Sequence, residues 1–148
     1  VEAAFGEADE VMIEAFMQGT EITCGCYKTR EKSVVFPITE VVAHNEFFDY
    51  DAKYNGQVDE ITPARIPDHV RDVVQALTLK IYDILGCKGI IRVDYILTDN
   101  WTINLLEVNT TPGMTPTSLL PQEAAAVGMN FNQLCEKIIE ISLKRYQK

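Results

Sequence analysis

The sequence predicts an α+β fold, a single domain over residues 1–148 with a mainly antiparallel sheet flanked by helices. Short runs of β-branched and aromatic residues follow one another across short polar turns, which is typical of antiparallel strands. Two later stretches repeat apolar residues at helical spacing. With 148 residues, 47% of them hydrophobic, the chain is long enough to bury one core.

The first part of the chain predicts a short helix and a meander. Residues 1–8 have a helical pattern, and residues 10–16, 21–28 and 33–42 alternate as three strands joined by polar turns. Residues 43–66 then break the pattern with Asn, Gly and Pro around a group of aromatic side chains. A loop of this length is commonly functional.

The second part predicts one long helix, a hairpin and two further helices. Apolar residues recur at helical spacing from Asp68 to Leu85, with Asp68 near the N-cap and Gly86 at the C-terminal end. A hairpin over residues 88–108 turns near Asp99-Asn100. After it we expect a loop at 109–117, a helix over 118–127 and an amphipathic helix over 132–145.

The hairpin brings acidic and amide side chains together. A turn centred on Asp99-Asn100 pairs residue 92 with 107 and residue 94 with 105, so Arg92, Asp94, Glu107 and Asn109 share one face. A one-residue slip would destroy this arrangement. Hard oxygen ligands beside a cation suggest a magnesium–nucleotide site. The alternative is an Arg92–Glu107 salt bridge on a solvated face.

Charge and hydropathy exclude some partners. The net charge of −9 argues against nucleic acid or an anionic membrane as partner, and no run approaches the ~20 apolar residues of a membrane-spanning helix. No signal peptide is visible. The chain begins at Val1, inside a helix-like run, so we expect a fragment of a longer protein.

Four segments resemble the C-terminal part of D-alanine–D-alanine ligases, which are ATP-grasp enzymes of bacterial cell-wall synthesis. They are Tyr50–Tyr54, Gly86–Asp94, Leu105–Thr115 and Ser118-Leu119, in order and with compatible spacing. The resemblance implies an ATP-grasp C-terminal subdomain in a cytoplasmic, homodimeric parent that binds ATP and D-alanine. In this family ATP phosphorylates one D-alanine, and the amino group of a second attacks the acyl phosphate.

The resemblance also implies roles for residues near the hairpin. Asp94, Glu107 and Asn109 should hold two Mg²⁺ ions, which Mn²⁺ could replace, that bridge the ATP phosphates. Arg92 and the backbone N–H of Gly113 should stabilise the oxyanion of the tetrahedral intermediate. The expected site for the carboxylate of the second D-alanine is Ser118 with Leu119 beside it, although Ser118 could be merely an N-cap.

The remaining roles implied by the resemblance concern ATP. Glu14, Ala15, Phe16 and Met17 correspond to the strand that binds adenine, and Glu21 to the residue that binds the ribose hydroxyls. Lys53 corresponds to a lysine on the γ-phosphate, and Tyr54 to a tyrosine that closes the loop over substrate and favours an amine as acceptor.

The family segments that grip the phosphates and bind the first D-alanine are absent, so we expect a half-site that is inactive alone. Other hypotheses are a sibling ATP-grasp ligase of the D-alanine–D-lactate type, a non-catalytic nucleotide-binding module, and a metal-binding protein without nucleotide.

Overall fold

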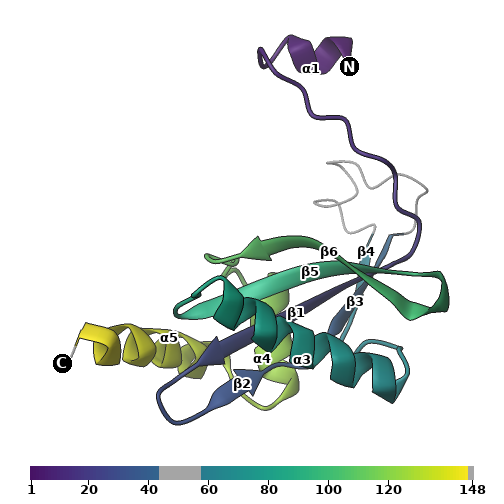
Figure 1. The fold of residues 1–148 in the computed structure, drawn as a ribbon. Coiled ribbons are helices and arrows are strands. Elements are labelled where there is room, and N and C mark those ends of the chain that lie inside the picture. Colours follow the sequence, from purple (N-terminus) through teal and green to yellow (C-terminus); the bar gives the residue numbers. More distant parts are fainter. Residues whose placement is uncertain (44–57, 147–148) are drawn as a thin grey trace.

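The computed structural model describes residues 1–43 and 58–146 (Figure 1). Its elements in chain order are α1 (Glu2–Phe5), β1 (Thr20–Lys28), β2 (Ser33–Val35), β3 (Thr39–Ala43), β4 (Val58–Ile61), α3 (Asp68–Ile84), β5 (Ile90–Thr98), a 3₁₀ turn η1 (Asp99–Trp101), β6 (Thr102–Asn109), α4 (Leu119–Ala126) and α5 (Phe131–Tyr146).

The strands form one sheet in the order β4-β3-β1-β5-β6, with β2 paired to the end of β1. Every pairing is antiparallel. β1 is the central strand, bonded to β5 along one edge and to β2 and β3 along the other. This confirms the predicted α+β class with a mainly antiparallel sheet.

Helix α3 covers one face of the sheet (Figure 1). Its buried Val70, Val74 and Ile81 recur at helical spacing and pack against alternate residues of β1 and β5. The helix begins after Pro67 and ends before Gly86, whose φ is +60°, so both predicted boundaries are confirmed within a residue.

Helices α4 and α5 cover only part of the opposite face. A second buried cluster joins Tyr27 and Ile90 of the sheet to Leu120 and Ala124 of α4 and Leu134 of α5. These contacts lie toward the end of β1 and the beginning of β5, because Tyr27 pairs with Ile90. Among the described residues, the remainder of this face carries the polar residues of the candidate site.

The prediction of a strand at residues 10–16 is wrong, and the helix predicted over residues 1–8 is shorter than expected. Only Glu2–Phe5 are helical, and residues 11–18 have no regular structure. Met12, Ile13 and Phe16 are 80%, 76% and 81% exposed. A strand needs a neighbour for its N–H and C=O groups, and Figure 1 shows this segment running away from the sheet.

Two further strand predictions need correction. The predicted strand over 33–42 is two strands, β2 and β3, separated around Pro37, which has no N–H to donate. Strand β4 lies within the segment predicted to be a loop. It has four residues, and the two at its centre, Asp59 and Glu60, are both acidic. The segment therefore lacks the alternation of apolar and polar residues that predicts a strand.

The other predicted elements are confirmed. The hairpin is β5 and β6, and the two C-terminal helices are α4 and α5. Among the described residues, no helix combines the length and apolar character required to cross a bilayer.

Candidate functional site

Four polar side chains of the β5–β6 hairpin share one sheet face, as predicted, but in a different register. Arg92 lies opposite Asn109, and Asp94 lies directly opposite Glu107. The predicted pairs 92/107 and 94/105 are therefore wrong. The turn holds three residues, Asp99–Trp101, which shifts the register by one, and the unpaired Leu106 shifts it by one more. The two shifts restore the facing of the side chains.

Asp94 is the centre of the candidate site. Its side chain accepts hydrogen bonds from Thr23 Oγ1 at 2.7 Å, Arg92 Nε at 2.8 Å and Asn109 Nδ2 at 3.0 Å. Only 8% of the residue is exposed. Burial alone would raise the pKa of Asp94, but the hydrogen bonds and charge of Arg92 outweigh it and lower the pKa, so this carboxylate is ionised at neutral pH.

Asn109 joins the two carboxylates. Its Nδ2 donates to Asp94 Oδ2 and to Glu107 Oε1, each at 3.0 Å. Glu107 is exposed, whereas Asn109 is half-buried. The site thus has a buried end at Asp94 and an open end at Glu107, with a carboxamide between them.

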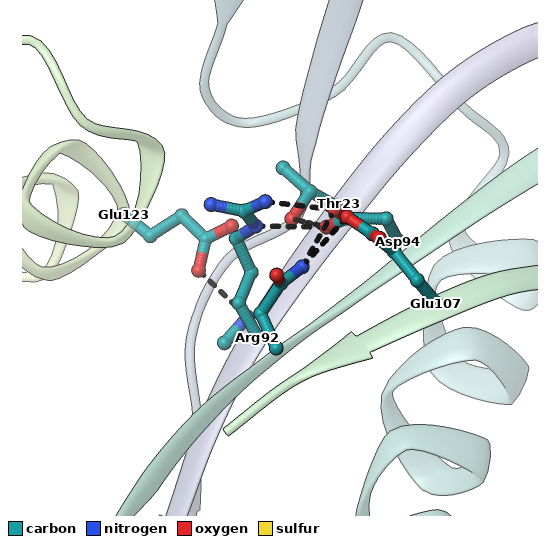
Figure 2. Close-up of polar contacts among 7 residues, drawn as sticks. Thr23, Arg92, Asp94, Glu107 and Glu123 are labelled. Atoms are coloured by element: carbon teal, nitrogen blue, oxygen red, sulfur yellow. Dashed lines mark hydrogen bonds and ion pairs between the residues drawn. The ribbon is translucent and has the colours of Figure 1, made fainter. Parts of the chain in front are cut away.

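Arg92 makes its ion pair with Asp94, two residues along the same strand. Its Nε and Nη2 donate to the two carboxylate oxygens at 2.8 Å and 2.7 Å, a bidentate geometry (Figure 2). The predicted alternative, a cross-strand salt bridge between Arg92 and Glu107, is therefore not the arrangement found. The hydrogen bonds to Asp94 raise the pKa of Arg92.

The loop after β6 brings Gly113 and Ser118 into contact. A Cβ atom added to Gly113 would lie 2.8 Å from Ser118 Oγ. Ser118 occupies the N-cap position of α4, as the alternative interpretation expected, but its hydroxyl makes no capping bond to that helix. Instead Ser118 Oγ accepts a hydrogen bond from Thr115 N at 3.0 Å. Leu119, the first residue of α4, is half-buried.

The predicted ATP-binding residues are only partly placed by the structure. Glu14, Ala15, Phe16 and Met17 lie in the exposed segment before β1 and are not brought to the hairpin. Glu21 is on β1, two residues before Thr23, and therefore on the face that carries Asp94. Lys53 and Tyr54 lie outside the described residues.

Two polar residues of this site were missed by sequence analysis. Thr23 is buried on β1 opposite Asp94, to which it donates a hydrogen bond. Glu123 is fully buried on α4, and its Oε2 accepts a hydrogen bond from the backbone N–H of Gly25 at 2.7 Å. Glu123 is the one charged residue of α4, and this was the available signal.

Glu123 extends from α4 toward the sheet beside Arg92 (Figure 2). Burial raises its pKa well above the usual range; the hydrogen bond from Gly25 and the charge of Arg92 oppose this only in part. Its Oε1 is buried and has no hydrogen-bond partner in the structure. The carboxyl group of Glu123 is therefore directed toward the guanidinium group of Arg92, which pairs with Asp94 instead.

The donor set suits a hard divalent cation that shares its ligands with a phosphate. Asp94 and Glu107 supply carboxylate oxygens, and a half-turn of the Asn109 carboxamide would add a third oxygen. No trio of His, Cys, Asp and Glu side chains within residues 1–43 and 58–146 is arranged to hold a metal. Further ligands would have to come from a bound phosphate or water.

Comparison with known proteins identifies the family. A family model described as D-ala D-ala ligase C-terminus matches residues 1–140. The D-alanine–D-alanine ligase of Bacteroides fragilis is 72% identical over 137 residues, which are 93% of this chain and 42% of that protein. The chain thus spans about two fifths of the length of the curated relatives it matches.

Solved structures agree with this result. A D-alanine–D-alanine ligase from Bacillus anthracis complexed with ATP is 37% identical, with a TM-score of 0.71 over 87% of this chain and 41% of its own. The VanG D-Ala:D-Ser ligase from Enterococcus faecalis is 32% identical, with a TM-score of 0.69 over 85% of this chain and 37% of its own. With its family model, its relatives and its fold in agreement, the chain belongs to the family of the D-alanine–D-alanine ligase C-terminus.

Proposed function

We propose that this chain is the part of an ATP-dependent D-alanine–D-alanine ligase that carries the metal ligands and the site for the second D-alanine. The observation that supports this most is the convergence of Asp94, Glu107 and Asn109 at one end of the β5–β6 hairpin. The 72% identity to a D-alanine–D-alanine ligase favours the same substrates here.

Asp94, Glu107 and Asn109 are the residues that would hold Mg²⁺, as two ions, with Mn²⁺ able to replace them. When bound, such ions offset the charge of the ATP phosphates and of the phosphoryl group in transfer. The role of the chain is to hold the two carboxylates close together and to keep the carboxylate of Asp94 ionised. Arg92 and Thr23 do this for Asp94, because their hydrogen bonds favour its charged form.

Arg92 and the backbone N–H of Gly113 would stabilise negative charge on the tetrahedral intermediate. Arg92 is held by Asp94 on the same face as the proposed metal ligands, which supports this role. Gly113 is exposed and has no Cβ, so its backbone would allow a substrate oxygen to approach closely.

Ser118, with Leu119 beside it, would bind the carboxylate of the second D-alanine. The Ser118 hydroxyl is not used to cap α4, and it faces Gly113 across the loop. A substrate carboxylate here would lie at the N-terminus of α4, where the helix dipole favours negative charge.

The ATP contacts complete the proposal. The backbone of Glu14–Met17 would bind adenine and Glu21 the ribose hydroxyls, while Lys53 would contact the γ-phosphate and Tyr54 would close the loop over substrate. Glu14–Met17 lie in an exposed segment that belongs to no helix or strand, which is consistent with their binding a ligand rather than packing against this sheet. Closure would exclude water from the acyl phosphate.

The chain would act within a longer protein. It spans 42% of the relative from Bacteroides fragilis, and we infer that residues 1–148 are a partial ATP-grasp domain that is inactive alone. The parent would be a homodimer in the cytoplasm, where ATP is supplied, without nucleic acid or membrane as partner; the net charge of −9 accords with this.

The test is ADP release by the full-length parent with Mg-ATP and D-alanine, repeated with excess D-lactate. We expect turnover that depends on D-alanine and gives only the dipeptide. A depsipeptide product would indicate an acceptor of the D-lactate type, and saturable ATP binding without turnover would indicate a nucleotide-binding module. The isolated chain should release no ADP; D-alanine-dependent release by it would contradict the half-site.

A further inference from the structure

Glu123 has a buried carboxyl group in which one oxygen accepts a hydrogen bond and the other has no partner. Its Oε2 accepts the backbone N–H of Gly25, and 0% of the residue is exposed. Its Oε1 has no hydrogen-bond partner. An unpaired buried carboxyl oxygen is costly, typically about 1–3 kcal/mol, so its retention calls for a partner present in some other state of the site.

The candidate partner for this oxygen is the guanidinium group of Arg92. Figure 2 shows the carboxyl group of Glu123 directed toward the guanidinium group of Arg92, and each of the two groups shifts the pKa of the other through its charge. In the structure the guanidinium group instead donates to both oxygens of Asp94.

A cation bound to Asp94 would compete with that pairing. Both oxygens of Asp94 already accept hydrogen bonds, Oδ1 from Thr23 and Arg92, and Oδ2 from Arg92 and Asn109. A divalent ion would need at least one of these oxygens and would repel the guanidinium charge. Arg92, whose side chain is only 16% exposed, would then need another anionic acceptor.

We infer that Glu123 is a positioning residue for Arg92: when a divalent cation occupies Asp94, Glu123 releases its proton to solvent and its Oε1 accepts the guanidinium group. The inference rests on the proposed function of Asp94 as a metal ligand. The exchange gives a partner to both groups, because the guanidinium group of Arg92, once displaced from Asp94, donates to the unused oxygen of Glu123. It also keeps Arg92 beside the proposed oxyanion position during turnover.

The test measures the binding of Mn²⁺ alone to the 148-residue chain, from the electron paramagnetic resonance signal of the free ion. Four forms make a double-mutant cycle: the unchanged chain, Glu123→Gln, Arg92→Met, and both substitutions together. Gln keeps one oxygen for Gly25 but presents an amide to Arg92. Glu136→Gln, on the exposed surface of α5, is the matched control for loss of one negative charge.

We expect Glu123→Gln to weaken Mn²⁺ binding about tenfold or more, the size of a hydrogen bond to a charged group. In the Arg92→Met background the same substitution should change binding less than twofold, and Glu136→Gln should change it less than twofold in either background. Equal weakening with and without Arg92 would overturn the positioning role while leaving the metal site intact. Failure of the unchanged chain to bind Mn²⁺ would overturn the metal site and the inference together.

Discussion

Replacing Gly25 with alanine should separate α4 from the sheet. A Cβ atom at this position would lie 2.4 Å from Leu120 Cδ1 and 2.6 Å from Glu123 Oε2. Leu120 and Glu123 are both fully buried, so neither can move aside into solvent. The added methyl group must therefore push the helix outward or force both side chains into poor rotamers.

Two costs combine in this substitution. Overpacking of a buried site costs about 1–3 kcal/mol. Displacing Glu123 Oε2 from the Gly25 N–H, 2.7 Å away, leaves a buried carboxyl and a buried amide unpaired, which costs about 1–3 kcal/mol more. We therefore expect the free energy of unfolding to fall by about 2–6 kcal/mol, a large part of the stability of a domain this size.

The assay is urea unfolding followed by far-ultraviolet circular dichroism, with Gly128→Ala as control. Gly128 has open space around its Cβ position and a φ of +80°, so alanine there should cost only the backbone strain, about 1–2 kcal/mol. Leu120→Ala, normally worth about 2–5 kcal/mol, should cost at least about 1 kcal/mol less in the Gly25→Ala background. Equal costs in both backgrounds, or a Gly25→Ala chain as stable as the control, would refute the steric reasoning.

Three further outcomes can be measured on the same chain. Asp94→Asn should destabilise it by roughly 2–3 kcal/mol and abolish Mn²⁺ binding, whereas Asp83→Asn, whose side chain is 64% exposed, should cost less than about 1 kcal/mol in urea unfolding. Burial raises the pKa of Glu123, so the folded chain keeps a proton that the unfolded chain loses above about pH 4.3. The free energy of unfolding should therefore fall as the pH rises from about 4.3 through the pKa of Glu123 in the folded chain. Glu123→Gln should flatten this pH profile, whereas Glu136→Gln should leave it unchanged. Deleting Leu106 should remove the bulge and leave Glu107 opposite Asp94, because the pairs Tyr95–Leu105 and Asp94–Glu107 then become consecutive, so the variant should keep its Mn²⁺ binding; loss of binding would contradict this register.

Sequence periodicity predicted the elements that carry their own local signal. Helix α3 has apolar residues at regular spacing and a glycine stop, and the β5–β6 hairpin has alternation on both sides of a polar turn. Strand β4 lacks such a signal, because its four residues are held by pairing with β3 rather than by a pattern of their own. The segment before β1 has a strand-like sequence but no strand to pair with among the described residues.

The shared face of the four polar side chains of the hairpin was predicted correctly, but for an incomplete reason. The assumed two-residue turn and unbroken ladder ignored two single-residue shifts, the longer turn at Asp99–Trp101 and the bulge at Leu106. Neither is visible as periodicity, since each is set by twist and packing of the hairpin. The two shifts add to an even number of residues, so Asp94 and Glu107 still share a face, and they lie directly opposite each other.

Helix α4 links the stability of the fold to the geometry of the candidate site. It approaches β1 closely because Gly25 has no side chain, and Glu123 fixes that approach with a buried hydrogen bond. The same helix begins beside Ser118, whose hydroxyl lies against Gly113. A change that lifts α4 from the sheet must therefore move Ser118 relative to Asp94. Core packing at Gly25 thus sets the distance between the proposed acceptor site and the proposed metal site, although neither site includes that residue.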